Sequence, residues 1–166
     1  GQMGGNVIKS ARDKDVNVKL GVDRESGSRM GLNVAHDENF EELLERKDVD
    51  VIVDFTVPEA TMKYLEAAKN SDTPIVIGTT GFTEKQLEEI RKAGEEIPVL
   101  KASNFSPSIN VMRKLVKEAA EKLQNYDIEI TETHHNKKRD APSGTAKTLL
   151  EEVKEARENV KEVHGR

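Results

Sequence analysis

Residues 49–101 read VDVIVDFTVPEATMKYLEAAKNSDTPIVIGTTGFTEKQLEEIRKAGEEIPVLK, and this stretch decides the fold. Short apolar runs alternate in it with amphipathic segments, in the order 49–55, 58–70, 74–77, 83–93 and 97–101. Strands that alternate with helices of about a dozen residues are typical of βαβ units, in which helices cover both faces of a parallel sheet. The stretch therefore predicts a parallel α/β sheet.

Two local signals support the predicted helices of this stretch. Pro58 suits a first helical turn, where a missing N–H costs little. Thr83 followed by Gln86 fits a capping box, in which the two side chains satisfy the free N–H groups of a helix start. The beginnings of both helices are therefore predicted more firmly than their ends.

The residues before this stretch carry half of a dinucleotide-binding pattern. Residues 16–22 predict a strand and residues 40–46 a short helix. The opening GQMG (1–4) has the form of a glycine-rich turn, which lets backbone approach a pyrophosphate at a helix N-terminus. Asp23 stands where such folds place an acid for the ribose hydroxyls, and Arg24 beside it suits a 2′-phosphate. A tight turn and a strand-end acid without this role remain an alternative.

Polar residues follow three of the predicted strands. They occupy residues 54–56 (DFT), 78–81 (GTTG) and 103–106 (SNFS). In open α/β sheets the ligand lies beyond the carboxyl ends of the strands, so three polar ends suit a flat cofactor lying across them. Ordinary turn chemistry favours the same residue types, and this alternative stays open for each loop.

The pattern changes after residue 101, where we predict a domain boundary. Residues 107–125 predict a long amphipathic helix and residues 145–160 a last helix. Between them, residues 126–133 (YDIEITET) alternate apolar and polar side chains, which predicts a strand with one wet face. We therefore expect a dinucleotide-binding domain at 1–102 and the start of an α+β domain at 103–166.

Composition narrows the classes of function. The formal net charge of −5 argues against general affinity for nucleic acid or anionic membrane. Cysteine is absent, which excludes disulfides, cysteine-ligated metals and a cysteine nucleophile. No apolar run approaches the ~20 residues needed to span a bilayer. We expect a cytoplasmic protein with no membrane or nucleic-acid partner.

Residues 132–146 (ETHHNKKRDAPSGTA) are the most specific segment of the chain. They combine two imidazoles, three permanent cations and a helix start that presents free N–H groups to an anion. In an acidic protein this basic segment suits a small dicarboxylate ligand, and histidine exchanges protons near neutral pH. Adjacent histidines are also typical of metal sites, but no third ligand stands at useful spacing, so we expect no metal. A solvated basic loop is the other alternative.

At this segment the sequence resembles the dihydrodipicolinate reductase family. The family signature is a glutamate, a spacer, two histidines, then a lysine and Asp-Ala-Pro-Ser-Gly-Thr. It corresponds here to Glu132, His134, His135, Lys138 and residues 140–145. The similarity extends through essentially all of the chain.

The resemblance implies an NADH- or NADPH-dependent oxidoreductase of the diaminopimelate route to lysine, normally a homotetramer. It implies that His134 donates or accepts a proton, that Lys138 donates one, and that the substrate carboxylates are held by His135, Lys138, Gly144 and Thr145. It assigns the cofactor to Gly1, Gln2, Met3, Asp23, Arg24, Gly78, Thr79, Thr80, Ser103, Asn104, Phe105 and Ser106.

The fold class implied is α/β: a Rossmann-like parallel-sheet nucleotide domain followed by an α+β mixed-sheet substrate and oligomerisation domain. We expect both to be incomplete in this chain, with one strand before Gly1 and further strands after Arg166. Asp23 stands where the family commonly has Glu, which leaves the choice between NAD and NADP open. Another dehydrogenase of amino-acid metabolism and a non-catalytic nucleotide-binding fragment remain as alternative functions.

Overall fold

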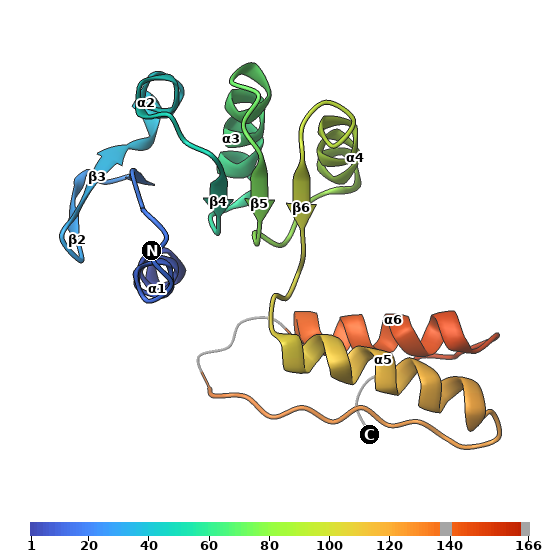
Figure 1. Cartoon of the computed structure of the whole chain (residues 1–166). Helices are drawn as coiled ribbons and strands as arrows, with labels where there is room; N and C mark the ends of the chain where they lie inside the picture. Colours follow the sequence, from blue (N-terminus) through green and yellow to red (C-terminus); the bar gives the residue numbers. More distant parts are fainter. Residues whose placement is uncertain (137–140, 164–166) are drawn as a thin grey trace. The chain divides into compact units, whose positions relative to one another are not determined.

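The computed structural model of the chain describes residues 1–136 and 141–163 (Figure 1). It divides into two compact units, Gly1–Ser103 and Asn104–Arg166. Each unit has its own secondary structure and is described separately below. No helix in the described ranges combines the length and the apolar character needed to cross a membrane.

A parallel sheet forms the centre of the first unit and confirms the predicted α/β class. Its strands β4 (Ile52–Asp54), β5 (Ile75–Ile77) and β6 (Val99–Lys101) lie in the order β4-β5-β6. Helices α3 (Pro58–Asn70) and α4 (Glu84–Ala93) connect them (Figure 1). Pro58 stands in the first turn of α3, and Thr83 and Gln86 form the predicted capping box of α4. The local signals therefore placed both helix starts correctly.

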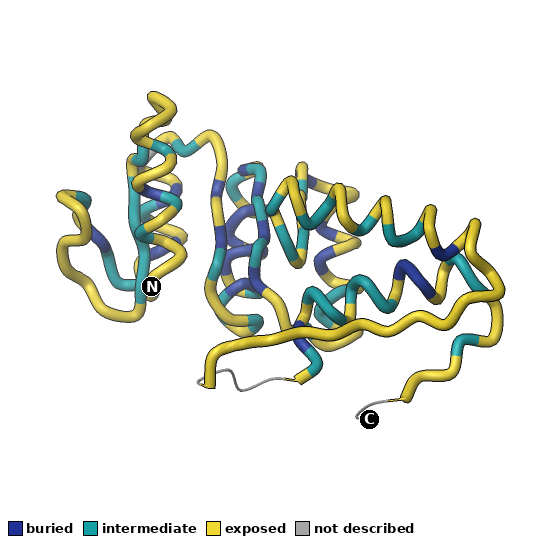
Figure 2. Tube along the Cα trace, turned by 90° about the horizontal axis from the view of Figure 1, so that it is seen from below, coloured by how far each residue is buried: buried dark blue, intermediate teal, exposed yellow. Residues whose placement is uncertain are grey.

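The core lies on one face of this sheet. Ile75 and Ile77 of β5 are almost fully buried against α3 and α4, and the buried positions gather along these elements (Figure 2). Helix α2 (Phe40–Lys47) joins this core through the Phe40 ring, whose centroid lies 4.6 Å from that of Tyr64. On the opposite face Val53 and Leu100 are 45% and 57% exposed. The expectation of helices on both faces is therefore wrong for the described residues.

A second sheet in the first unit has the order β1-β3-β2. Strand β1 (Gly21–Asp23) pairs in parallel with β3 (Leu32–His36), and β2 (Gly27–Arg29) pairs with β3 as an antiparallel hairpin. The strand predicted at 16–22 thus begins later, and the hairpin was not predicted. Helix α1 (Gln2–Arg12) precedes this sheet, and the short helix η1 (Asp37–Asn39) follows it.

The second unit consists, in its described part, of two paired helices and extended segments. Helices α5 (Pro107–Lys122) and α6 (Gly144–Ala156) pack together, and Arg113 Nε and Nη2 donate to Glu152 Oε1 at 2.8 and 2.6 Å. The guanidinium of Arg157 donates to the carbonyls of Ala120 and Tyr126 at the end of α5. Both helices end earlier than predicted.

The prediction of a strand at residues 126–133 is wrong. These residues are exposed and belong to no strand, and none of the described strands pairs with them (Figure 2). A period-two pattern indicates which side chains face water. A strand also needs a neighbouring strand that pairs with its backbone N–H and C=O groups. Alternation alone therefore overpredicted this element.

Candidate functional site

The carboxyl ends of β4 and β5 bring the predicted polar loops together. The Gly78 N–H donates to the Asp54 carbonyl at 2.8 Å, and the Thr56 N–H donates to Thr79 Oγ1 at 2.9 Å. Ala102, next to Ser103, donates its N–H to the Ile77 carbonyl at 3.1 Å. Residues 54–56, 78–79 and 102–103 consequently form one continuous edge beyond the three parallel strands, as the sequence predicted.

Within this edge, Thr79 and Thr80 have different environments. Thr79 is 3% exposed, and its hydroxyl donates to Asp54 Oδ2 at 3.1 Å while it accepts the Thr56 N–H. Thr80, in contrast, is exposed. The Thr79 side chain therefore links the loops to one another, and Thr80 is the threonine whose side chain is open to a ligand.

Position 78 requires glycine because the Phe55 ring occupies the space that a side chain would need. A Cβ built on Gly78 would lie 2.1 Å from Cε1 and 2.5 Å from Cδ1 of that ring. The backbone at Gly78 does not have a positive φ, so conformation alone would permit alanine there. The glycine of this loop thus makes room for an aromatic side chain from the neighbouring loop.

A second group of predicted cofactor residues gathers around Asp23. Its Oδ2 accepts from the terminal amino group of Gly1 at 2.8 Å, and its Oδ1 accepts the Arg24 N–H at 2.8 Å. Arg29 Nη2 lies 3.2 Å from the same Oδ2.

Arg29 was missed by the sequence interpretation. It comes from the unpredicted hairpin strand β2, and its side chain is 44% exposed beside Asp23. The structure therefore places Gly1 beside Asp23 and adds a second arginine there. Gln2 and Met3 begin helix α1, whose N-cap is Gly1.

Residues 104–106 lead into the second unit at the start of helix α5. Asn104 Oδ1 accepts the Ser106 N–H at 2.8 Å, and Asn110 Nδ2 donates to the Asn104 and Ser106 carbonyls at 3.3 and 3.1 Å. Ser106 is the N-cap of α5, and Phe105 is 40% exposed. These bonds fix the loop that precedes the helix and leave an aromatic ring at its surface.

Glu132 connects His134 with the start of helix α6. Its Oε2 lies 3.0 Å from His134 Nε2, and its Oε1 accepts the Ser143 N–H at 2.8 Å. Ser143 is buried and caps α6 by accepting the Ala146 N–H at 3.1 Å. One carboxylate therefore orients an imidazole and holds the end of a helix, although the sequence interpretation gave Glu132 no role.

The environment of Glu132 keeps it ionised. The Ser143 hydroxyl and amide, followed by His134, lower the pKa of Glu132 from its ordinary 4.5 to about 2. An ionised carboxylate accepts a hydrogen bond from Nε2 of the imidazole, which leaves Nδ1 for exchange with a ligand. His135 and Gly144 are exposed and Thr145 is half-buried. Lys138, the predicted proton donor, lies outside the described residues.

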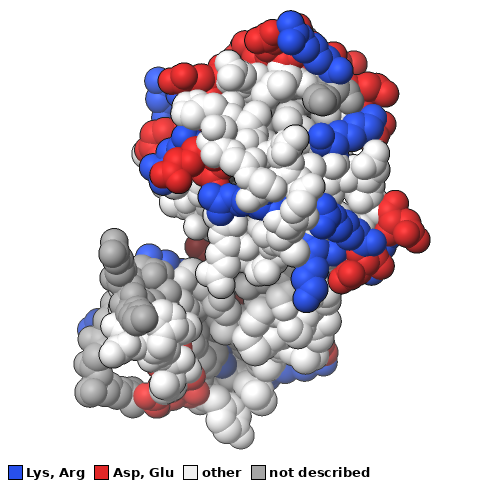
Figure 3. All heavy atoms as spheres, turned by 90° about the vertical axis from the view of Figure 1, so that its left-hand side faces the viewer, with Lys and Arg blue, Asp and Glu red and all other residues white. Residues whose placement is uncertain are grey.

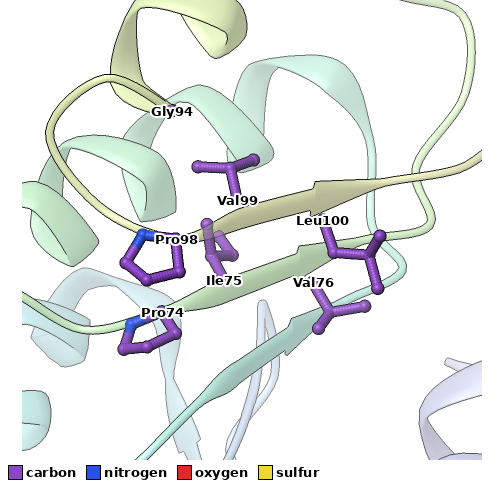
Figure 4. Close-up of a pocket in the computed structure, with 7 residues that line it drawn as sticks. All are labelled: Pro74, Ile75, Val76, Gly94, Pro98, Val99 and Leu100. Carbon is purple, nitrogen blue, oxygen red and sulfur yellow. The ribbon is translucent and has the colours of Figure 1, made fainter.

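An apolar hollow lies elsewhere in the first unit. It is shallow, opens at the starting ends of β5 and β6 (Figure 4), and is lined by Pro74, Ile75, Val76, Gly94, Pro98, Val99 and Leu100. It contains no charged or hydroxyl side chain that could orient a polar ligand. The polar carboxyl ends of the strands are therefore the better candidate site.

The distribution of surface charge and the arrangement of possible metal ligands also bear on the candidate site. On the face of the molecule in Figure 3, basic side chains lie among acidic ones instead of forming one basic field. Across residues 1–136 and 141–163, no group of three or more His, Asp or Glu side chains is placed to hold a metal ion.

Comparison with protein families gives two matches that together span nearly the whole chain. Residues 1–105 match the family described as dihydrodipicolinate reductase, N-terminus, and residues 108–165 match dihydrodipicolinate reductase, C-terminus.

Curated relatives agree with these matches. The chain is 45% identical over 166 residues to the 4-hydroxy-tetrahydrodipicolinate reductase of Haloarcula marismortui and 44% identical over 167 residues to that of Natronomonas pharaonis. Both alignments cover 100% of this chain but 66% and 67% of the relatives. The chain thus spans about two thirds of the length of the curated relatives it matches.

A solved structure supports the fold. The dihydrodipicolinate reductase of Paenisporosarcina sp. TG-14, determined with dipicolinate bound, superposes with a TM-score of 0.82 at 28% identity. The superposition covers 99% of this chain and 66% of that one.

Proposed function

We propose, because this chain belongs to the dihydrodipicolinate reductase family, that its protein reduces dihydrodipicolinate to tetrahydrodipicolinate with a pyridine nucleotide. That dihydrodipicolinate forms by loss of water from the 4-hydroxy-tetrahydrodipicolinate of the diaminopimelate route to lysine. The observation that carries the proposal is the Glu132 carboxylate, which holds His134 on one oxygen and the N-terminus of α6 on the other. This arrangement supports a proton-transfer group close to an anion-binding helix end.

The first unit has groups suited to a pyridine nucleotide. Asp23 carries two acceptor oxygens at a strand end, which suit ribose hydroxyls, and Arg24 is exposed beside it. Gly78, Thr80 and Ser103 lie along the polar edge beyond the sheet, where α/β folds bind ligands. Bound NADH or NADPH would supply a hydride to a carbon conjugated with the ring imine of the substrate.

The second unit has groups suited to the substrate. The N-terminus of α6 at Gly144 and Thr145 presents free N–H groups and partial positive charge, which favour a carboxylate. His135 is exposed for the same role, and His134 supplies the proton that completes the reduction. We assign Lys138 a second proton-donating and carboxylate-binding role, as the family resemblance implies.

The same proposal includes the choice of nucleotide, the oligomeric state, the location and the partners of the protein. Arg24 makes NADPH the better substrate of the two nucleotides at low salt, because a guanidinium pairs with a 2′-phosphate. We further propose a homotetramer, as the resemblance implies. The absence of cysteine and the net charge of −5 support a cytoplasmic location without nucleic-acid or membrane partners. Light scattering on the purified protein measures the tetramer directly.

The test is a spectrophotometric assay with the fresh condensation product of pyruvate and aspartate semialdehyde. His134→Gln and Lys138→Ala should each lower kcat by about 10²-fold or more, as expected when a proton donor is lost. His36→Gln in the first unit and Lys114→Ala on α5 are the matched controls and should leave kcat unchanged. Turnover within threefold of the parent in both test variants would refute the assigned roles.

A further inference from the structure

The buried carboxylate of Asp54 has no part in the function proposed so far. Asp54 ends strand β4 and is 3% exposed. Its Oδ1 accepts from Thr56 Oγ1 at 2.6 Å, and its Oδ2 accepts from Thr61 Oγ1 and, at 3.1 Å, from Thr79 Oγ1. Burying a carboxylate is costly unless donors replace water, and here three hydroxyls replace it.

The three hydroxyls come from three different segments. Thr56 belongs to the loop after β4, Thr61 to the first turns of α3, and Thr79 to the loop after β5. The Thr79 hydroxyl also accepts the Thr56 N–H at 2.9 Å, so it bridges the carboxylate and the backbone of the opposite loop. Asp54 is therefore the common acceptor that fixes both loops to each other and to helix α3.

The same loops also contain exposed residues. Thr56 and Thr80 are exposed, whereas Thr79 and Asp54 are buried. A residue that is 3% exposed has almost no surface with which to touch a bound cofactor. Its effect on a ligand must therefore pass through the loops that it holds.

We propose that Asp54 is a positioning residue for the pyridine nucleotide. Its carboxylate holds the loops after β4 and β5 in the arrangement that receives the cofactor. This inference rests on the proposed function, which places Gly78 and Thr80 at the polar edge that receives the cofactor. Donors from three separate segments meet on this one side chain, which suits a group that fixes two loops to each other.

Two substitutions separate positioning from simple stability. Asp54→Ala removes both acceptor oxygens, so the Thr56, Thr61 and Thr79 hydroxyls lose their common partner. Asp54→Asn keeps the size and one accepting oxygen, so it should retain part of the network. The matched control is Thr73→Val, which removes the hydroxyl of another buried threonine at the opposite end of β5, where it lies 2.9 Å from the Ser71 hydroxyl.

The experiment measures NADPH and dipicolinate binding by calorimetry and the unfolding midpoint in urea for the purified protein. Asp54→Ala should weaken NADPH binding by about tenfold or more, because small misplacements of binding groups have large effects. Asp54→Asn should weaken it by less. Thr73→Val should lower the midpoint without changing NADPH affinity, and dipicolinate binding should stay constant in all three variants.

The outcomes distinguish this inference from the function on which it rests. NADPH affinity within twofold of the parent in both Asp54 variants would overturn the positioning role alone. A loss of affinity that follows the loss of stability equally in Asp54→Ala and Thr73→Val would also overturn it. A parent protein that binds neither NADH nor NADPH would overturn the proposed function and this inference together. If Asp54→Ala does not fold, unchanged affinity in Asp54→Asn suffices for refutation.

Discussion

Replacing Gly78 by alanine tests the close packing of the two loops at the carboxyl edge of the sheet. The new Cβ would lie 2.1 Å from the Phe55 ring, whereas carbon atoms approach one another to about 3.5 Å. The ring must therefore withdraw by roughly 1.4 Å, the difference between these two distances. Overpacking of this kind costs about 1–3 kcal/mol of unfolding free energy, and the permitted φ at Gly78 adds no backbone strain.

A double-mutant cycle in urea isolates this contact. Gly78→Ala should cost about 1–3 kcal/mol in the parent but less than about 0.5 kcal/mol in a Phe55→Ala background, where the ring no longer occupies the space. Gly27→Ala is the control, since a Cβ there would meet nothing within 4 Å. An equal loss from Gly78→Ala in both backgrounds would show that the Phe55 ring does not exclude the side chain.

Two further predictions concern charged groups. Because Ser143 and His134 lower the pKa of Glu132 from 4.5 to about 2, its contribution to stability is complete above pH 4.5 and is lost as the pH falls toward 2. Thermal melts of Glu132→Gln should therefore depend less on pH in this window, and an unchanged dependence would contradict the Ser143 and His134 contacts. Arg24→Ala should weaken NADPH binding more than NADH binding, by a factor that shrinks as salt screens the exposed charge. Equal weakening of both nucleotides, measured by titration at two salt concentrations, would assign Arg24 to the fold instead.

The parts of the fold that were predicted correctly depend on signals within a few residues. The Thr83–Gln86 capping box and the placement of Pro58 are such signals, and α4 and α3 begin where they indicate. Apolar runs bounded by turn residues likewise located β4, β5 and β6. The order of these strands was not predicted, but consecutive strands lie side by side, as short connections favour.

The parts that were missed depend on residues distant in sequence or on unusual backbone. The β2–β3 hairpin turns at Met30 and Gly31 with φ of 52° and 72°. Turns with two positive φ angles are usually signalled by Asn-Gly or Asp-Gly, and methionine gives no such signal. Residues 126–133 show the opposite error, since their alternation was clear but no described strand pairs with them.

In the candidate site, too, the features that depend on neighbouring residues were predicted, and the contacts between segments distant in sequence were not. The sequence predicted that polar residues would meet beyond the sheet, because parallel strands end at one edge. It did not predict that the Thr79 hydroxyl is buried against Asp54, or that Arg29 lies beside Asp23. Both depend on contacts between segments whose approach is decided by packing, and periodicity carries no information about such pairs.

The core of the first unit has a consequence for the order in which the protein folds. The buried members of its main cluster all come from one continuous run of the chain, between Phe40 and Ile97. Contacts between neighbouring segments close short loops, so they form early and at a small entropic cost. Asp54 and Thr79 lie inside the same run. We therefore expect the loops after β4 and β5 to acquire their geometry as this run of the chain folds, independently of helix α1.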